Sequence, residues 1–488
     1  MYPGKNMQSN LDFAEKTYRR KRIENWDRVS IGKEEKRGIG KYYHDLLRHY
    51  YRFVIPPGLK VLELGCGRGD LLSSVEPAFG VGVDFSREMI RRASGKHKNL
   101  FFLCADAHEV ALKTKFDVII LSDLVNDLWD VQRTFENIQK LSHPGTRIVI
   151  NYFNNLWRIP LGIAKRIGLG HLVLEQNWLS PDDILNLLKL SGFEIIKHGS
   201  HIILPLYFPL ISNLANRYAV RFFPFSWFAL TNMVVARPEP LSNNAGNCDS
   251  SSVSVIIPAR NEAGNIEGII KRIPHLGKET EIIFVEGHSN DGTYEIAESM
   301  IKKYPDRNIK VYRQKGKGKG DAVRLGFEKA GCDILMILDA DMTVPPEVLP
   351  RFYEAIISGK GEFINGVRLV YPMEDEAMRF LNIAGNKFFS MAFSWLLDQP
   401  VKDTLCGTKV LFKKDYEMIS KNRGYFGHFD PFGDFDLLFG AAKLNLKIAE
   451  LPLRYRSRTY GETNIDRWRH GWILLKMVIF AARRIKFI

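Results

Sequence analysis

The sequence lacks the marks of several protein classes. Its five cysteines lie far apart and form no CxxC pair, so neither a disulfide framework nor a zinc site is indicated. We therefore expect the protein to reside in the reducing cytosol. The first residues are polar and lack the apolar core of a signal peptide, which argues against export. No apolar run reaches the roughly 18 residues that a membrane-spanning helix needs.

No block of charge stands out either. Lys and Arg number 69 against 55 Asp and Glu, a net charge of +14, and both halves of the chain share the excess. A diffuse basic excess favours phosphorylated small molecules or anionic membrane surfaces at least as much as nucleic acid. We therefore expect no nucleic-acid partner.

The 488 residues suffice for more than one globular domain, and composition indicates where the chain divides. Residues 239–252 are rich in Ser and Asn and nearly free of large apolar side chains, which predicts a linker. We expect one domain over residues 1–238 and a second over residues 253–488.

Short apolar strands alternate with helix-like stretches on both sides of the linker, which predicts two α/β domains. In the first domain we expect strands at residues 60–64, 80–84, 100–103, 117–121 and 146–151, and a final antiparallel pair at 193–198 and 231–236. In the second domain we expect strands at residues 253–258, 281–286, 309–313 and 334–338. Residues 201–230 are unusually apolar and aromatic, and we interpret them as core with a lid in preference to a surface that dips into a membrane.

A glycine-rich turn follows the first expected strand, in VLELGCGRGD at 61–70. Gly65, Gly67 and Gly69 let the backbone turn sharply and approach a ligand, and the next helix offers free N–H groups. Asp84 ends the second strand, where a carboxylate can accept hydrogen bonds from ribose hydroxyls. The pattern indicates a nucleoside site.

This stretch resembles the class I S-adenosylmethionine-dependent methyltransferases, whose first motif is an acidic residue followed by GxGxG. The resemblance implies a Rossmann-like sheet with S-adenosylmethionine as cofactor. It also implies that the methionine part lies at Glu63, Gly65 and Gly67, the ribose at Asp84, and the adenine at Asp106 and Ala107.

A methyl acceptor with a hydroxyl group needs a base. Asp123, Asn126 and Asp127 follow the fourth strand, and Asp123 is our candidate, although each of them is equally plausible as a helix cap or a solvated residue. The sequence does not identify the methyl acceptor, and we consider a glycan or a lipid. A nucleic-acid methyltransferase is disfavoured because no NPPY-like tetrad follows the fourth strand.

Two carboxylates end a strand of the second domain, at Asp339 and Asp341. Side chains two apart on a strand point the same way, and paired carboxylates suit Mg²⁺ or Mn²⁺ that also binds a diphosphate. A solvated turn is the alternative. Two further polar stretches at strand ends, 258–262 and 286–293, and the glycine- and lysine-rich segment 315–330 favour the metal site.

Together these motifs resemble the family-2 glycosyltransferases of the GT-A fold, in particular the dolichyl-phosphate mannose synthase branch. The resemblance implies a metal at Asp339 and Asp341, and an inverting transfer from a nucleotide-sugar. The nucleotide-sugar site it implies comprises Pro258, Arg260, Glu262, Glu286, Asp291, Lys319 and Asp339. One departure is Glu286-Gly287-His288-Ser289, which stands where the family has Asp-Asp-Gly-Ser.

The same resemblance points to acceptor-side residues near the end of the chain. Asp434 is our candidate base and Asp436 the second choice, with a helix-start carboxylate as the alternative role. Alternation predicts that Arg454, Arg456 and Arg458 share one side of a strand, and Arg458 is the preferred phosphate ligand.

The C-terminal segment 466–488 has a basic face with Arg469, Lys476 and Arg483 and an apolar face that includes Trp472 and Ile479. This pattern predicts either an amphipathic helix on an anionic membrane surface or an ordinary helix packed on the domain. We favour the first.

We therefore predict a bifunctional, cytoplasmic protein peripherally associated with a membrane. It transfers a sugar to a polyprenyl-phosphate or a lipid-linked glycan and also transfers a methyl group. The alternatives are a glycosyltransferase with a non-catalytic S-adenosylmethionine-binding module, and a GT-A-like nucleotidyltransferase.

Overall fold

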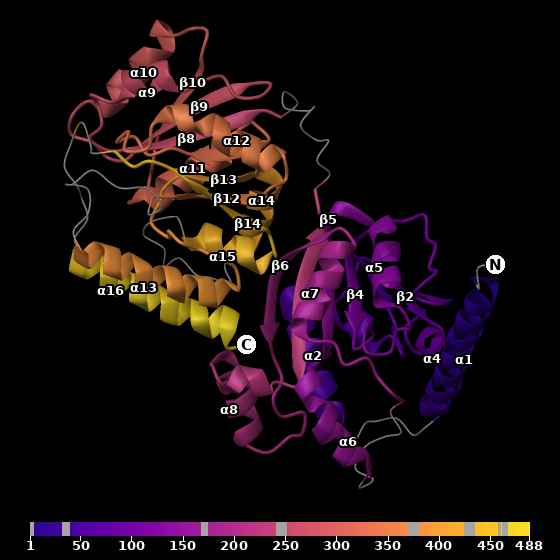
Figure 1. Cartoon of the computed structure of the whole chain (residues 1–488). Coiled ribbons are helices and arrows are strands. Elements are labelled where there is room, and N and C mark those ends of the chain that lie inside the picture. Colours follow the sequence, from indigo (N-terminus) through magenta and orange to yellow (C-terminus); the bar gives the residue numbers. More distant parts are fainter. Residues whose placement is uncertain are drawn as a thin grey trace. The chain divides into compact units, whose positions relative to one another are not determined.

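The computed structural model describes residues 4–31, 40–166, 174–240, 251–368, 380–423, 435–456, 460 and 467–488. The chain divides into two compact units, Met1–Glu239 and Pro240–Ile488, coloured indigo to magenta and rose to yellow (Figure 1). Most of the predicted linker lies outside the described residues.

The first unit is built on a seven-stranded sheet of order β3-β2-β1-β4-β5-β7-β6. Its strands are β1 (Lys60–Leu64), β2 (Phe79–Asp84), β3 (Phe101–Cys104), β4 (Phe116–Ser122), β5 (Ser142–Phe153), β6 (Phe193–Ser200) and β7 (Thr231–Pro238). The first five pair in parallel, and β7 is antiparallel to both β5 and β6. The predicted α/β class, strand positions and final antiparallel pair are confirmed.

Helices form most of the connections between these strands, as parallel crossovers usually do, although none of the described residues between β3 and β4 is in a helix. The helices are α1 (Gly4–Ile31), α2 (Lys41–Val54), α3 (Asp70–Ser74), α4 (Arg87–Lys96), α5 (Val131–Lys140), α6 (Arg158–Arg166), α7 (Pro181–Leu190) and α8 (Ile211–Arg217). Side chains start several of them: Asp130 accepts the Arg133 N–H before α5, and Ser180 forms a capping box with Asp183 at α7.

The second unit is also built on a seven-stranded sheet, of order β10-β9-β8-β11-β13-β12-β14. Its strands are β8 (Val253–Ala259), β9 (Thr280–Glu286), β10 (Asn308–Arg313), β11 (Ile334–Ile337), β12 (Phe363–Val367), β13 (Lys409–Phe412) and β14 (Ile448–Pro452). Strand β13 is antiparallel to β11 and β12. The four predicted strands are confirmed, whereas β12 to β14 are additional to the prediction.

The helices of the second unit are α9 (Ile266–Arg272), α10 (Thr293–Lys303), α11 (Lys319–Lys329), α12 (Leu349–Ile357), α13 (Phe380–Leu397), α14 (Lys413–Lys421), α15 (Phe435–Lys443) and α16 (Arg467–Ala481). Helices α13 and α16 lie side by side (Figure 1). Among the described residues, no helix is both long and apolar enough to span a membrane.

Helix α16 buries a different face from the apolar one predicted for it. Leu474, Met477 and Ala481 are buried in the core shared with α13, while Trp472 and Ile479 are exposed. The helix therefore packs on its domain and also keeps large apolar side chains in contact with solvent.

Both sheets contain a point where successive connections leave in opposite directions. In the first unit it lies between β1 and β4, and in the second between β8 and β11. Ligands of open α/β sheets bind at such points, beyond the carboxyl ends of the strands. We therefore expect the ligand-binding sites at the loops that follow these four strands.

Helix α11 packs so closely on the second sheet that one of its positions has no room for a side chain. A Cβ at Gly326 would lie 2.5 Å from Ile256 Cγ2, on β8, and 3.3 Å from Val285 Cγ2, on β9. By contrast, a Cβ at Gly385 of α13 meets nothing within 4 Å.

We expect Gly326→Ala to lower the free energy of unfolding of the second unit by about 1–3 kcal/mol, because the added methyl group overpacks the sheet. Gly385→Ala is the matched control and should raise it by up to about 1 kcal/mol, as alanine favours a helix. Thermal melting of both variants measures the difference, and equal melting temperatures would contradict the packing described here.

Candidate functional site

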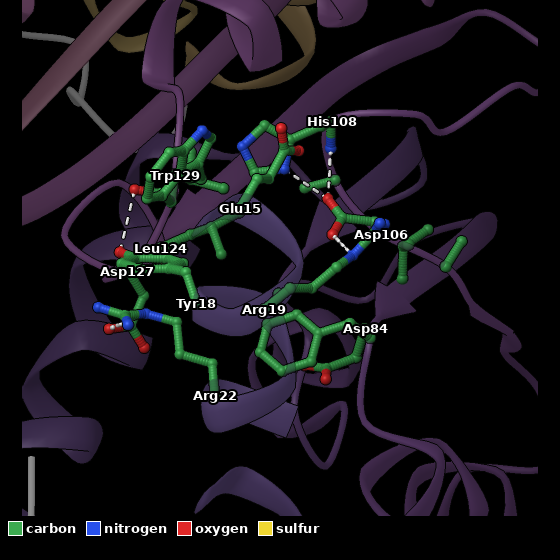
Figure 2. Close-up of a pocket in the computed structure, with 16 residues that line it drawn as sticks. Glu15, Tyr18, Arg19, Arg22, Asp84, Asp106, His108, Leu124, Asp127 and Trp129 are labelled. Carbon is green, nitrogen blue, oxygen red and sulfur yellow. Dashed lines mark hydrogen bonds and ion pairs between the residues drawn. The ribbon is translucent and has the colours of Figure 1, made fainter. Parts of the chain in front are cut away.

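A cavity opens at the carboxyl ends of the strands in the first unit. Four residues that the sequence assigned to the cofactor line it, Gly65, Asp84, Asp106 and Ala107. Figure 2 shows Asp84 and Asp106 in the lining. The cavity therefore lies at the switch point between β1 and β4, where a nucleoside is expected.

The glycine loop is held by the carboxylate that the sequence assigned to the ribose. Asp84 Oδ2 accepts the Gly67 N–H at 2.9 Å, and Asp84 Oδ1 accepts the Ser86 N–H at 2.9 Å. Gly65 has φ +70°, and a Cβ there would lie 2.8 Å from Leu124 Cδ1. The position therefore requires glycine, because a side chain would clash and the backbone is left-handed.

Glu63 and Gly69 lie behind the loop rather than on the cavity wall. Glu63 is 2% exposed and accepts the Leu72 N–H at 3.0 Å. Burial raises the pKa of Glu63 well above its usual value, with the Leu72 hydrogen bond acting in the opposite direction. Gly69, at φ +74°, immediately precedes α3. Both residues position the loop.

Asp106, the candidate adenine ligand, already has two partners. It pairs with Arg19 of α1 and with the His108 ring, and it accepts the His108 N–H at 2.9 Å. Burial alone would raise the pKa of Asp106, but His108 and Arg19 more than offset it and lower the pKa to about 2. The carboxylate is therefore ionised and able to accept a hydrogen bond from an amino group.

Helix α1 lies across the cavity, a feature that the sequence analysis missed. Figure 2 shows Tyr18, Arg19 and Arg22 reaching from α1 into the cavity lining. The Arg22 guanidinium lies 3.5 Å from the centre of the Tyr18 ring and 3.5 Å from Asp127 Oδ1. Trp26 Nε1 donates to Asp127 Oδ2 at 2.9 Å.

The polar sequence of α1 carries no apolar stripe that would have indicated this position. Its contacts are ion pairs, hydrogen bonds and aromatic contacts such as that of Tyr18 with Trp129, whose ring centres are 5.1 Å apart. They exist only because α1 returns to the strand ends of its own unit. The helix thus covers the place where the sequence puts the cofactor.

Asp123 stands at the end of β4 in a left-handed conformation, φ +53°. Its Oδ1 accepts from Tyr43 Oη at 2.9 Å and from Asn151 Nδ2 at 2.6 Å. Burial raises its pKa to about 6, although His44, Tyr43 and Asn151 each act to lower it. A carboxylate that titrates near 6 suits a general base, since it is ionised at neutral pH and still takes up a proton.

The two neighbours that the sequence grouped with Asp123 have structural partners. Asn126 is fully buried, donates to the Asn177 carbonyl at 2.8 Å and accepts the Phe153 N–H at 3.1 Å. Asp127 lies in the cavity wall and binds α1. Asp123 has partners of its own and is not among the residues that line the cavity, so its role as the base stays a prediction.

In the second unit, three loops meet at the carboxyl ends of β8, β9 and β10. The Asn290 N–H donates to Asn261 Oδ1 at 3.0 Å, which joins the loops after β8 and β9. His288 Nε2 and the Gly316 carbonyl oxygen are 2.9 Å apart, which joins the loops after β9 and β10. The unusual His288 therefore contacts the glycine- and lysine-rich segment.

The predicted nucleotide ligands occupy these loops. Glu262 is buried and accepts from Asn265 Nδ2 at 2.7 Å, and Asp291 accepts the Ala263 N–H at 3.1 Å. Glu286 is also buried and accepts the Ser289 N–H. Pro258 is half-buried at the end of β8, and Arg260 beyond it is exposed. The structure thus brings the predicted set to one edge of the sheet.

Lys319 and Asp339 form the central ion pair of this edge, with Lys319 Nζ 2.6 Å from Asp339 Oδ1. Burial raises the pKa of Asp339, but Lys319, Lys409 and Arg368 more than offset it, so the pKa lies below its usual value. A Cβ at Gly407 would overlap both Asp339 Oδ2 and Lys319 Nζ. Residue 407 therefore needs to be glycine for the pair to form.

Asp341 lies two residues further on, next to Asp339 in the turn after β11. Its Oδ1 accepts from the Thr343 backbone N–H at 3.1 Å and from Thr343 Oγ1 at 2.7 Å. Both carboxylates are partly exposed. Among the described residues, no three His, Cys, Asp or Glu side chains form a metal cluster.

The predicted acceptor residues are only partly covered by the structure. Asp434 and Arg458 lie outside the described residues. Asp436 is 7% exposed and pairs with Arg423 at 3.5 Å and Arg324 at 3.9 Å.

The prediction that Arg454 and Arg456 lie on a strand is wrong. Strand β14 ends at Pro452, and the Arg456 N–H donates to the Thr343 carbonyl at 2.9 Å. The chain is therefore held against the turn that follows Asp341 instead of continuing the sheet.

Comparisons with known proteins identify both units. Residues 254–418 match the family model of glycosyl transferase family 2, and residues 55–179 match the model of a methyltransferase domain. The chain is 32% identical over 246 residues to the dolichol-phosphate mannosyltransferase of Pyrococcus furiosus, covering 48% of this chain and 67% of that protein. The chain belongs to glycosyl transferase family 2.

A relative from another organism agrees with this membership. The chain is 29% identical over 231 residues to the dolichyl-phosphate hexose transferase of Haloferax volcanii, covering 46% of this chain and 92% of that protein. A solved magnesium protoporphyrin IX methyltransferase from Synechocystis PCC 6803 aligns at 17% identity and a TM-score of 0.33, over 47% of this chain and 99% of that one. The family model, and not this likeness, identifies the methyltransferase domain. The protein therefore combines a family-2 glycosyltransferase with a methyltransferase.

We expect Asp84→Ala to weaken S-adenosylmethionine binding by roughly tenfold to a hundredfold, because the ribose loses its acceptor and the glycine loop loses the hydrogen bond that the Gly67 N–H donates. Isothermal titration calorimetry measures the affinity. Glu136→Ala, which removes an exposed carboxylate from α5, is the control and should bind as the wild type does. Equal affinities of the two variants would remove Asp84 from the site.

Proposed function

We propose that the second unit transfers a sugar from a nucleotide-sugar to a polyprenyl-phosphate or lipid-linked glycan, and that the first transfers a methyl group from S-adenosylmethionine. The observation that supports the sugar transfer best is the Lys319–Asp339 pair at the carboxyl end of β11. It sets a cation for a diphosphate beside a carboxylate that suits a metal ion. The names of the Pyrococcus and Haloferax relatives support the lipid-phosphate acceptor.

The residues at the edge of the second sheet divide the donor between them. Glu262 and Asp291 face the nucleoside, while Lys319 and the N-terminus of α11 stabilise the diphosphate. The acceptor oxygen forms a bond to the anomeric carbon as the bond to the diphosphate breaks, with inversion. Asp434 takes the proton of a sugar hydroxyl, or positions an acceptor phosphate that is already anionic, and Arg458 binds a phosphate.

Asp339 and Asp341 fit a divalent ion. Mg²⁺ is commonly held by one or two carboxylates together with substrate phosphates and water, so two carboxylates of the chain suffice. The ion would neutralise charge on the departing diphosphate. Lys319 would then share Asp339 with the metal.

In the first unit, Asp123 is the proposed base for the methyl acceptor. An acceptor oxygen or nitrogen forms the bond to the methyl carbon, the electron pair of the broken carbon–sulfur bond stays on the donor sulfur, and Asp123 takes the acceptor proton. Tyr43 and Asn151 hold the carboxylate through the hydrogen bonds described above. Helix α1 covers the donor.

A peripheral position on the cytoplasmic face of a membrane follows from a lipid-borne acceptor. The exposed Trp472 and Ile479 and the exposed basic side chains of Lys476 and Arg483 on the C-terminal helix suit an anionic lipid surface. The sheet of the second unit would also suit a nucleotidyltransferase, which is the second candidate function. The membership of the chain in glycosyl transferase family 2 does not favour it.

Asp341→Ala should reduce sugar transfer by roughly a hundredfold or more, because the metal ion that would neutralise the departing diphosphate loses one of its two carboxylate ligands. The measurement incubates the protein with Mn²⁺, membranes and a panel of UDP-, GDP- and dTDP-sugars, and follows label entering the lipid fraction. S-adenosylmethionine binding, in the other unit, should stay unchanged. Sugar transfer that continues at an undiminished rate in the presence of a chelator would contradict the proposed role of the metal ion.

Methyl transfer should rise with pH through about 6, since Asp123 acts as a base only when it is ionised. The assay follows S-adenosylhomocysteine release with a membrane lipid extract as acceptor, from about pH 5 to about pH 8. Asp123→Asn should lower the rate by roughly a hundredfold and flatten the profile. Unaltered affinity for S-adenosylmethionine is the control, and an unaltered pH profile would exclude Asp123.

A further inference from the structure

An extensive apolar surface of the methyltransferase unit is exposed to solvent. The insertion between β6 and β7 was expected to supply core, and it does so through Ile202, Val220, Ala229 and Leu230. Many of its other large apolar side chains are exposed: Leu210 is 86% exposed, Phe223 70% and Trp227 62%. We call the exposed apolar side chains of residues 206–228, with those of residues 156–163, the aromatic surface.

The aromatic surface is continuous. The rings of Phe223 and Trp227 are in contact, with centres 4.9 Å apart. Trp157 Nε1 donates to the Phe228 carbonyl at 3.0 Å, which places the segment leading into α6 beside the insertion. The exposed Ile159 of α6 extends the surface from there. Contiguous apolar patches of this kind on a soluble domain mark sites of interaction.

Backbone strain supports a functional reason for this exposure. Leu210, directly before α8, has φ +64°, a conformation that is costly for a branched side chain. The strained residue is also the most exposed of the surface. The chain thus accepts strain where it presents a leucine to solvent, with no compensating burial within the unit.

The charge of the surface selects its partner. Residues 201–230 and 155–168 contain no Asp or Glu. Arg217 and Arg158, which belong to these segments, are exposed. Tryptophan, phenylalanine and tyrosine together with arginine, without acidic residues, match the interfacial layer of an anionic bilayer.

The aromatic surface connects to the proposed methyl-acceptor site. The Tyr207 ring contacts Tyr42 of α2, with centres 5.3 Å apart. The next residue, Tyr43, donates to Asp123 and lies 3.2 Å from Thr231 Oγ1, directly after the insertion. One helix therefore contacts both the insertion and the candidate base.

We propose that the aromatic surface docks on an anionic lipid bilayer and that the methyl acceptor is a lipid-borne molecule presented there. This inference rests on the proposed function in taking Asp123 as the acceptor end of the site. It adds a membrane contact independent of the C-terminal helix. The apolar part of the acceptor stays in the bilayer while its polar end reaches Asp123.

The first experiment measures binding of the full chain to vesicles of phosphatidylcholine mixed with phosphatidylglycerol. The double variant Phe223→Ser, Trp227→Ser should bind about tenfold or more weakly, because two large apolar side chains no longer insert. Leu190→Ser is the matched control. Leu190 is also an exposed apolar residue, at 62%, but it lies before the start of β6, whereas the insertion follows the end of that strand. Equal binding of wild type and double variant would overturn the proposal, provided that thermal melting shows both folded.

The second experiment places one residue in the bilayer. Lipids brominated on their acyl chains quench tryptophans that insert, so Trp227→Phe should lose part of the quenched fluorescence. Trp472→Phe, on the C-terminal helix, is the control that keeps the Trp227 contribution. If Trp227→Phe leaves the quenched fraction unchanged, the aromatic surface does not enter lipid.

The third measurement separates this inference from the proposed function. In the double variant, sugar transfer to a detergent-solubilised polyprenyl phosphate and affinity for S-adenosylmethionine should be unchanged, while methyl transfer to vesicle-borne lipid should fall about tenfold or more. Failure of sugar transfer in the wild type would contradict the proposed function alone. Methyl label that enters only water-soluble products, or a dimer in solution that the double variant abolishes, would overturn the inference.

Discussion

In each sheet there is one place where the connections that follow two neighbouring parallel strands leave in opposite directions, and both candidate sites depend on it. Chain connections leave in opposite directions between β1 and β4, and again between β8 and β11. Buried strands of this kind hold their ends rigidly, so loops of few residues can present side chains to a ligand. The glycine loop with Asp123 in one unit, and Lys319 with Asp339 in the other, follow from the same constraint.

Much of this arrangement is predictable because its signals are local. The Gly65 turn, the Asp84 strand end and the Asp339–Asp341 pair each occupy a few consecutive residues, and alternating strands and helices place them at one sheet edge. The strands β1 to β11 follow from short apolar runs between turn residues. Local pattern therefore sufficed for the fold class and for placing these residues at the strand ends.

The remainder depends on contacts between residues far apart in the sequence. Helix α1 reaches Asp106 and Asp127 through polar side chains that show no amphipathic pattern, and the need for glycine at 407 appears only when Lys319 and Asp339 meet. Composition shows that the insertion between β6 and β7 is apolar, but not which of its side chains are buried and which are exposed. Strand β13 runs antiparallel between β11 and β12, which periodicity does not reveal.

The helix across the cofactor cavity has a consequence for turnover. Tyr18 donates to the carbonyls of Asp127 and Leu128, and Arg22 and Trp26 bind the Asp127 carboxylate, so a spent nucleoside would leave only after several of these contacts open together. Release of a tightly covered product is often slower than the chemistry itself. Two indole rings, those of Trp26 and Trp129, lie at this contact, so any opening of α1 would change the fluorescence of the protein.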